Sequence, residues 1–186
     1  MIVLSGGGAN FGLPEISPYV TKAEVQLRMA GLDYEKRQAN PATGPKGQIP
    51  FINDDGSLIG DSAFIRMHLE REYGVDFDAA LSPLERATAL AIELAVDREL
   101  APAMTWFRWM VPVNFAKGPS RFFDYVPAEQ REAVKADVLE RVSASFLARG
   151  VGRHSPVEVA ALAVRSLDAI EVFIGDQPYL MGDEPC

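Results

Sequence analysis

Strand-like and helix-like segments alternate over residues 1–74, and their order limits how this part of the chain can fold. The four expected strands are short apolar or β-branched runs at residues 2–4, 32–38, 49–52 and 57–59. Two helices are expected, one from Ser17 to Gly31 and one from Asp61 to Gly74. An Asp54-Asp55-Gly56 turn joins the last two strands as a hairpin. This order predicts a small mixed sheet packed against helices.

The pattern changes between Gly74 and Ser82, and only helical periodicity follows. The expected helical segments start at Pro83, Pro127 and Ser155. Ser155 and Glu158 have the spacing of a capping box, in which each side chain accepts a backbone N–H of the other residue. We therefore predict an α/β domain at residues 1–76 and an all-α domain at residues 83–186.

The charge balance and the single cysteine narrow the class of protein. The 186 residues include 26 acidic and 18 basic side chains, a net charge of −8 that argues against nonspecific binding to nucleic acid. Cys186 is the only cysteine, so no intrachain disulfide can form, which suits a reducing compartment. The start of the chain lacks the basic segment of a secretory signal, and no apolar run is long enough to span a membrane. We expect a cytoplasmic protein.

Several common kinds of catalytic site find little support in the residues. Neither His68, on a polar helix flank, nor His154, before a helix cap, has a second ligand nearby, so we expect both on the solvated surface and no metal site. No Cys-x-x-Cys exists, and no Gly-x-Ser-x-Gly elbow supports a Ser-His-acid triad, although such partners meet only in space. The glycines at 6–8 lack a following Gly-Lys-Ser/Thr, which favours a flexible loop over a phosphate loop.

Ser17 is the strongest candidate for a chemical role. It precedes Pro18 at the start of the first helix, where serine caps the helix and proline suits its first position. A helix N-terminus favours an anion such as a thiolate, and a neighbouring hydroxyl can donate a hydrogen bond to it. Such a bond is worth about 1.5–3 kcal/mol and would lower the pKa of a bound thiol by about one to two units. A purely structural cap is the alternative interpretation.

Trp106, Trp109 and Phe115 belong to an aromatic stretch of the helical domain. Core packing explains such density in most proteins. The alternative is that these rings form one wall of a pocket for an apolar ligand.

Four motifs, in this order, resemble those of the glutathione transferase superfamily. They are Ser17-Pro-Tyr-Val with Lys22, Lys46-Gly-Gln-Ile-Pro-Phe-Ile, Gly60-Asp-Ser-Ala-Phe-Ile and Asp176-Gln-Pro-Tyr-Leu-Met-Gly-Asp-Glu-Pro. The resemblance spans most of the chain and implies a thioredoxin-like, glutathione-binding domain followed by an all-α domain. It also implies glutathione as co-substrate without a metal, and a homodimer formed through the first domain and the first long helix.

The resemblance implies a glutathione transferase in which Ser17 is catalytic. The Ser17 hydroxyl would stabilise the thiolate of glutathione for attack on a small apolar electrophile. That electrophile would lie against Trp106, Trp109 or Phe115. The resemblance does not separate conjugation from isomerisation, thiol transfer or peroxide reduction.

Five further residues would bind the tripeptide if the resemblance extends to function. Ile49, through its backbone just before a cis Pro50, would bind the cysteinyl part of glutathione. Asp61 and Ser62 would hold the γ-glutamyl end. Lys46 would meet a carboxylate.

The sequence also departs from the usual pattern of the family. Asp61 stands where glutamate is commoner, and the usual short helix between Gln38 and Lys46 is missing or reduced. The long loop after Gly6 resembles a subgroup related to the failed-axon-connections and metaxin proteins, several of which lack a settled catalytic role. A non-catalytic binding or adaptor protein is therefore the alternative function. Relatives continue beyond the position of Cys186, so we expect the helical domain to be incompletely represented.

Overall fold

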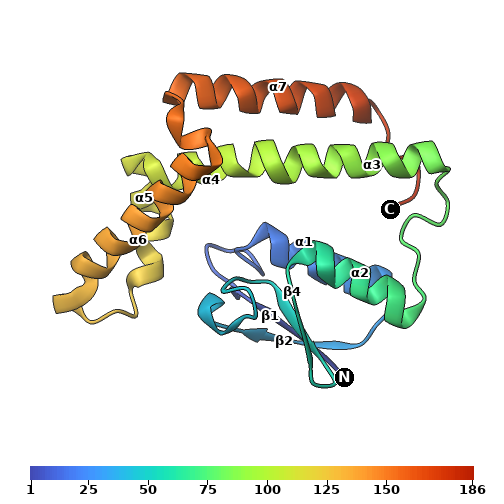
Figure 1. Cartoon of the computed structure of the whole chain (residues 1–186), viewed down its shortest axis with the longest axis horizontal. Coiled ribbons are helices and arrows are strands. Elements are labelled where there is room, and N and C mark those ends of the chain that lie inside the picture. Colours follow the sequence, from blue (N-terminus) through green and yellow to red (C-terminus); the bar gives the residue numbers. More distant parts are fainter. The chain divides into compact units, whose positions relative to one another are not determined.

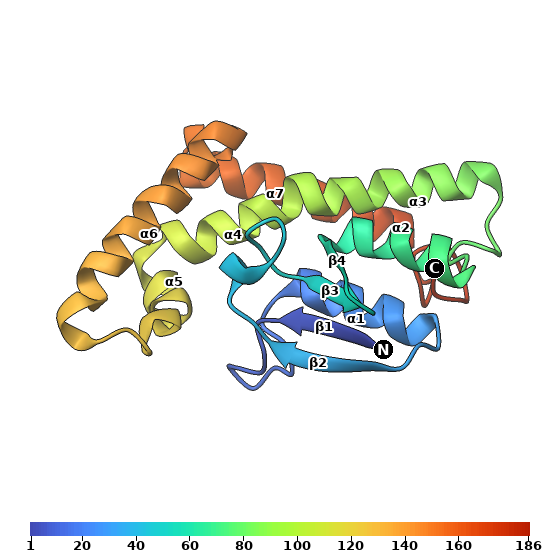
Figure 2. The ribbon, with the colours of Figure 1, turned by 60° about the horizontal axis from the view of Figure 1, so that its bottom comes forward.

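The computed structural model describes residues 1–186 and divides into two compact units, Met1–Ala80 and Leu81–Cys186 (Figure 1). The first unit contains a sheet of four strands: β1 (Ile2–Gly6), β2 (Tyr34–Gln38), β3 (Phe51–Asp54) and β4 (Ser57–Gly60). In the order β2-β1-β3-β4, β1 is parallel to β2 and antiparallel to β3, and β3 is antiparallel to β4. Helices α1 (Pro18–Met29) and α2 (Ser62–Tyr73) lie along the sheet (Figure 2). The predicted mixed sheet and its hairpin are confirmed.

Two segments of the first unit are short. One strand is shorter than we predicted, and the segment after it contains less helix than is usual in the family that the sequence resembles. β2 starts at Tyr34 rather than at residue 32, because the N–H of Leu32 still bonds to the carbonyl of Leu27 and completes the end of α1. Gly31 permits this return of the chain with a φ of 64°. The segment after β2 contains only one 3₁₀ turn, Pro41–Thr43, consistent with the reduced helix expected there.

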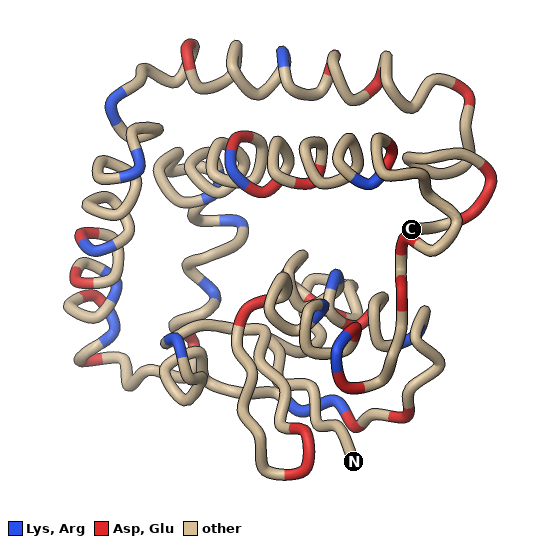
Figure 3. Tube along the Cα trace, turned by 45° about the vertical axis from the view of Figure 1, so that its right-hand side comes forward, with Lys and Arg blue, Asp and Glu red and all other residues tan.

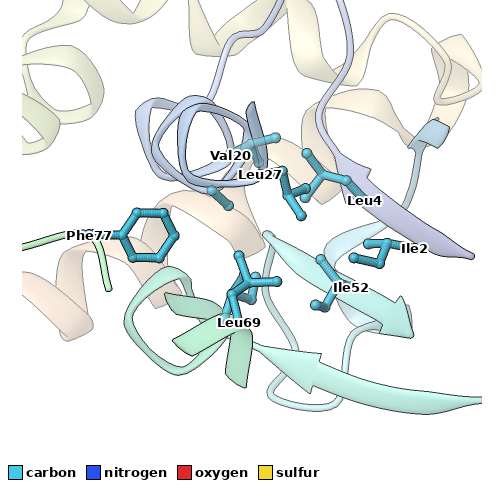
Figure 4. Close-up of a cluster of buried hydrophobic side chains, with 9 residues drawn as sticks. Ile2, Leu4, Val20, Leu27, Ile52, Leu69 and Phe77 are labelled. Atoms are coloured by element: carbon cyan, nitrogen blue, oxygen red, sulfur yellow. The ribbon is translucent and has the colours of Figure 1, made fainter. Parts of the chain in front are cut away.

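An apolar cluster between the sheet and its two helices forms the core of the first unit (Figure 4). Leu4 of β1 and Ile52 of β3 are paired opposite each other, so their side chains share one face of the sheet. Val20 and Leu27 lie two turns apart on α1 and cover that face. All four are fully buried. Burial of side chains of this size contributes about 1.5–3 kcal/mol each, and it fixes α1 against the sheet.

The second unit contains helices and no strand of a sheet, as predicted, and turns follow its last helix. Its α-helices are α3 (Pro83–Ala95), α4 (Ala101–Met110), α5 (Pro112–Lys117), α6 (Ala128–Arg149) and α7 (Pro156–Ile174). The capping box predicted at Ser155 and Glu158 is present, and α3 begins with a second one. Both acidic and basic residues lie along α6 (Figure 3). Arg141 pairs there with Asp137 at 2.6 Å. None of the helices combines the length and apolar character that crossing a membrane requires.

A π-helical turn, Val96–Leu100, joins α3 to α4. Pro102 explains it, because proline lacks a backbone N–H and its ring would collide with the carbonyl of Arg98 in a regular α-helix. The N–H of Ala101 instead reaches the carbonyl of Val96, five residues earlier. The widened turn lets the proline be accommodated near the start of α4.

The expectation that His68 lies on the solvated surface is wrong. His68 is only 7% exposed, and its Nε2 lies 2.8 Å from a carboxylate oxygen of Asp54 at the end of β3. Its Nδ1 lies 3.3 Å from the guanidinium of Arg71, which can only donate, so the ring proton belongs on Nε2 and is donated to Asp54. The hydroxyl of Tyr73 also donates to Asp54, at 2.9 Å. This network ties α2 to the β3–β4 hairpin. His154 is exposed, as expected.

The Asp54 network makes the stability of the protein depend on pH. Burial raises the pKa of Asp54, but hydrogen bonds from His68 and Tyr73 outweigh that effect and hold it below its ordinary value. The carboxylate therefore contributes stability that is fully present above pH about 4 and is lost as the pH falls through the lowered pKa. We predict that Asp54→Asn lowers the free energy of unfolding by about 1–3 kcal/mol at pH 7. The difference from wild type should shrink toward pH 3, as measured by urea unfolding.

Asp55→Asn is the matched control, because the Asp55 carboxylate adjoins the network in sequence but is 83% exposed. It should change the free energy of unfolding by less than about 0.5 kcal/mol. An Asp54→Asn loss that is equal at pH 7 and pH 3 would contradict the assigned role of the ionised carboxylate.

Candidate active site

Three segments of the first unit meet at one end of its sheet. β1 ends there at Gly6, and its antiparallel neighbour β3 starts there at Phe51. β4 ends at the same place, because Gly60 pairs with Phe51. The loop that leaves β1, the residues before β3 and the start of α2 therefore lie at this end. They carry all the candidates named for glutathione in the first unit: Ser17, Lys46, Ile49, Pro50, Asp61 and Ser62.

Ser17 is the N-cap of α1, as its sequence predicts. Its Oγ accepts the N–H of Val20 at 3.4 Å, and Pro18 occupies the first helical position. Ser17 is half-buried. Because Oγ accepts a bond from the helix, its own hydroxyl hydrogen is free to point away from the helix and is polarised by that bond.

Glu15 is a buried carboxylate next to Ser17 that sequence analysis missed. Its side chain is only 2% exposed. Oε1 accepts the backbone N–H groups of Gly7 at 3.1 Å, Ile16 at 3.0 Å and Ser17 at 3.0 Å. Oε2 accepts the N–H of Gly8 at 3.2 Å. The loop that we predicted to be flexible is thus tied down at both of its ends by one side chain.

The glycines make room for this carboxylate. A Cβ on Gly6 would lie 2.7 Å from Oε2 of Glu15 and 2.6 Å from Cγ1 of Val20. A Cβ on Gly7 would lie 3.0 Å from Oε1 of Glu15 and 2.9 Å from Cγ1 of Ile16. The glycine run resembles an anion-binding loop after all, but its anion belongs to the chain itself.

Lys36 of β2 balances the charge of Glu15. Its Nζ lies 3.3 Å from Glu15 and 2.6 Å from Glu24 on α1. Glu24 also pairs with Arg28 at 3.1 Å, so the four charges sum to zero. Burial lowers the pKa of Lys36, but its bonds to the two carboxylates outweigh burial and raise the pKa above its ordinary value. Lys36 is therefore positively charged at neutral pH.

The second part of the site joins the start of β3 to the start of α2. The Ile49–Pro50 peptide bond is cis. The N–H of Asp61 donates to the carbonyl of Pro50 at 3.0 Å. No backbone hydrogen bond involves the N–H or C=O of Ile49, which leaves both groups available to an extended peptide ligand. Ser62, the first residue of α2, is buried.

Asp61 has an unusual backbone conformation. Its φ is 85°, a region that residues with a Cβ rarely adopt and that costs about 1–3 kcal/mol. Its side chain caps α2 by accepting the N–H of Ala63 at 2.9 Å. Strained residues of this kind concentrate at functional sites, so this observation adds independent weight to Asp61 as a ligand-binding position.

Lys46 lies at the same end of the sheet and makes a cation–π contact that we did not predict from the sequence. Its ammonium group lies 3.6 Å from the ring centroid of Phe64, which is half exposed on the first turn of α2. Such a cation–π contact orients the ammonium without neutralising it. The charge of Lys46 is therefore kept available beside Asp61 and Ser62.

The aromatic candidates belong to the second unit. Trp109 packs against Phe115, with ring centroids 6.0 Å apart, and against Phe122 at 6.3 Å. Trp106 is separate from that cluster and packs edge-on against Phe107 at 5.2 Å. The structure thus brings together two of the three rings predicted to face an electrophile. All three are half-buried.

Of the two missed residues, Glu15 had no local signature. Glu15 follows a proline in a glycine-rich loop, and its partners lie up to eight positions away along the loop or on another strand. His68 does lie three residues after the buried Ile65, a spacing that marks the core-facing side of a helix and gave the one usable signal. Across the structure, no group of three or more His, Cys, Asp or Glu side chains is arranged to hold a metal ion.

The sequence profile of the glutathione S-transferase N-terminal domain matches residues 18–114, more than half of the chain. The chain is 30% identical over 191 residues to an isoprene-epoxide glutathione S-transferase of Rhodococcus sp. strain AD45, covering 99% of this chain and 80% of that protein. It is 27% identical over 183 residues to Failed axon connections of Drosophila melanogaster. That match covers 93% of this chain but only 44% of the fly protein.

Solved structures share the fold at low sequence identity. The β-etherase LigF of Sphingobium sp. matches 99% of this chain and 77% of its own, with a TM-score of 0.65 and 17% identity. Glutathione transferase Omega 3C of Trametes versicolor matches 98% of this chain and 66% of its own, with a TM-score of 0.60 and 16% identity. The profile match, the relatives and the fold agree. The chain belongs to the glutathione S-transferase superfamily.

Proposed function

We propose that the protein is a glutathione transferase in which Ser17 stabilises the thiolate of glutathione. The carrying observation is the Ser17 cap: its Oγ accepts the N–H of Val20, which leaves the hydroxyl hydrogen to donate to a ligand. A thiolate beside this hydroxyl would also feel the positive end of the α1 dipole. Both interactions favour the charged form of sulfur over the neutral thiol.

The other residues at this end of the sheet suit the rest of the tripeptide. The unpaired backbone N–H and C=O of Ile49, held by Pro50, suit the peptide groups of the cysteinyl residue. Asp61 and Ser62 lie at the start of α2, and Asp61 supplies a carboxylate for the ammonium of the γ-glutamyl end. Lys46 supplies a cation for a carboxylate.

The electrophile proposed for this chain is a small apolar epoxide that lies against Trp106, Trp109 or Phe115. The support is the family relative named for isoprene epoxide, together with the paired rings of Trp109 and Phe115. In this reaction the thiolate sulfur forms a bond to an epoxide carbon. The carbon–oxygen bond breaks toward oxygen, which then takes a proton from water. The thiol proton, released on thiolate formation, balances the equation.

A non-catalytic glutathione-binding or adaptor protein is the second candidate. Its support is the similarity to Failed axon connections over 93% of this chain. The two functions differ in one observable, because a binding protein need not form the thiolate.

Substitution of Ser17 tests the thiolate. We predict that Ser17→Ala raises the pKa of the thiol of bound glutathione by about one to two units, because one hydrogen bond to the charged sulfur is lost. The thiolate is followed by ultraviolet difference spectra across pH. Ser155→Ala is the matched control, since Ser155 also caps a helix and precedes a proline but lies in the second unit. Both variants lose a cap worth about 0.5–2 kcal/mol. Only Ser17→Ala should change the thiolate, and an unchanged titration would refute its role.

Substitution of Trp109 tests the electrophile surface. Trp109→Ala should lower kcat/KM for a small apolar epoxide by about tenfold or more, as expected for the loss of a large apolar contact. Binding of glutathione, measured by calorimetry, should stay the same. Tyr125→Ala is the control, because Tyr125 is an aromatic residue of the same unit that is 83% exposed. Equal effects of the two substitutions would argue against an electrophile surface at Trp109.

We further propose a cytoplasmic homodimer formed through the first unit and α3. The cytoplasm keeps glutathione and thiols such as Cys186 reduced. Leu84, Leu90 and Leu94 are exposed on α3, which suits contact with a second copy. We predict a mass of twice 20.3 kDa by light scattering, and a shift toward the single-chain mass in Leu90→Glu. A wild-type mass of 20.3 kDa at all concentrations would contradict the dimer.

A further inference from the structure

Glu15 is a buried charge, and one of its hydrogen bonds comes from Ser17, the residue proposed to face the thiol. Removing a carboxylate from water costs several kcal/mol unless hydrogen bonds and an opposite charge replace the lost hydration. Here four backbone N–H groups and the ammonium of Lys36 supply that replacement. A side chain this well satisfied has one defined position and holds its partners in place.

The four N–H donors come from both ends of one loop. Gly7 and Gly8 follow β1, whereas Ile16 and Ser17 precede α1. The carboxylate therefore links the end of β1 to the start of α1. Glu15 thus holds the backbone N–H of Ser17, while the N–H of Val20 holds the Ser17 side chain.

Glu15 also limits which hydrogen-bond donors near Ser17 remain available to a ligand. It takes the N–H of Ser17, and Pro18 has none. The hydroxyl is therefore the only group of Ser17 that can donate a hydrogen bond to a bound thiolate. The position of that hydroxyl matters more than it would if the backbone of Ser17 could share the task.

We propose that Glu15 is a positioning residue for the thiolate site: its carboxylate fixes Ser17, and Lys36 cancels its charge. The inference rests on the proposed function, since it assigns Glu15 a part in holding the residue that stabilises the thiolate. Without Lys36, a buried negative charge near Ser17 would oppose a second anion. Lys36, at 3.3 Å from Glu15, reduces that repulsion.

An electrostatic role and a positioning role of Glu15 predict opposite changes in the pKa of the bound thiol in Glu15→Gln. Loss of the negative charge alone would leave Lys36 less compensated and would lower the pKa of the bound thiol. Loss of position would raise that pKa, because the Gln amide nitrogen cannot accept the N–H of Gly8 or pair with Lys36, and Ser17 is no longer held. The sign of the change therefore separates a positioning role from a purely electrostatic one.

The experiment titrates bound glutathione by ultraviolet difference spectroscopy in wild type, Glu15→Gln and Glu35→Gln. Glu35→Gln is the matched control, since Glu35 also pairs with a cation but is exposed on β2. Glu15→Gln should raise the pKa of the bound thiol by about one unit, a tenfold fall in the ratio of thiolate to thiol. Exchange of the Gly7, Gly8 and Ser17 amides should become faster in Glu15→Gln alone. A lower or unchanged thiol pKa in Glu15→Gln overturns the proposal.

Gly7→Ala provides a second route if Glu15→Gln does not fold. It keeps every charge but pushes against Oε1 of Glu15 and Cγ1 of Ile16, so it should raise the thiol pKa in the same direction. An unmoved pKa in this variant also overturns the proposal. A wild type that binds glutathione without any thiolate band would instead overturn the proposed function, and the role of Glu15 with it. A wild-type band that both variants leave unmoved would refute the role of Glu15 alone.

Discussion

The pairing of β3 between β1 and β4 is the constraint on which the rest of the first unit depends. Backbone hydrogen bonds set the register, and the register sets which residues share an end of the sheet. Leu4 opposite Ile52 directs both side chains into the core, which in turn holds α1. Phe51 opposite Gly60 puts the residues before β3 next to those that open α2. A slip of one residue would turn the core side chains outward and separate these segments.

The two ends of this sheet carry two different polar networks. At one end, Glu15 and Lys36 fix the loop between β1 and α1. At the other end, Asp54 and His68 fix α2 to the hairpin. Each network joins a strand to the segment that follows or covers it, and each keeps its buried charge hydrogen-bonded, as buried charges require. The candidate glutathione site lies at the first end only.

Sequence patterns predicted the features that depend on neighbouring residues. The Ser17 cap, the Asp54-Asp55-Gly56 turn and the capping box at Ser155 follow from local chemistry, and the structure contains all three. The buried positions of Glu15 and His68 could not be predicted in this way, because tertiary contacts create them: His68 meets Asp54 across 14 positions. The π-helical turn before Pro102 also escaped prediction, since helical periodicity alone does not report a widened turn. Local sequence patterns thus predict the helices, the strands and the Ser17 cap. The buried residues that hold the site in place arise from tertiary packing.

If the first unit binds glutathione as a thiolate, binding at neutral pH releases the thiol proton, and this release can be measured. Calorimetric titrations of glutathione in two buffers with different heats of protonation measure the protons released at neutral pH. S-methylglutathione, which has no thiol proton, serves as the matched ligand. We predict proton release with glutathione and none with S-methylglutathione, because only a thiol whose pKa falls on binding loses its proton. Equal proton release with the two ligands, or none with either, would contradict it.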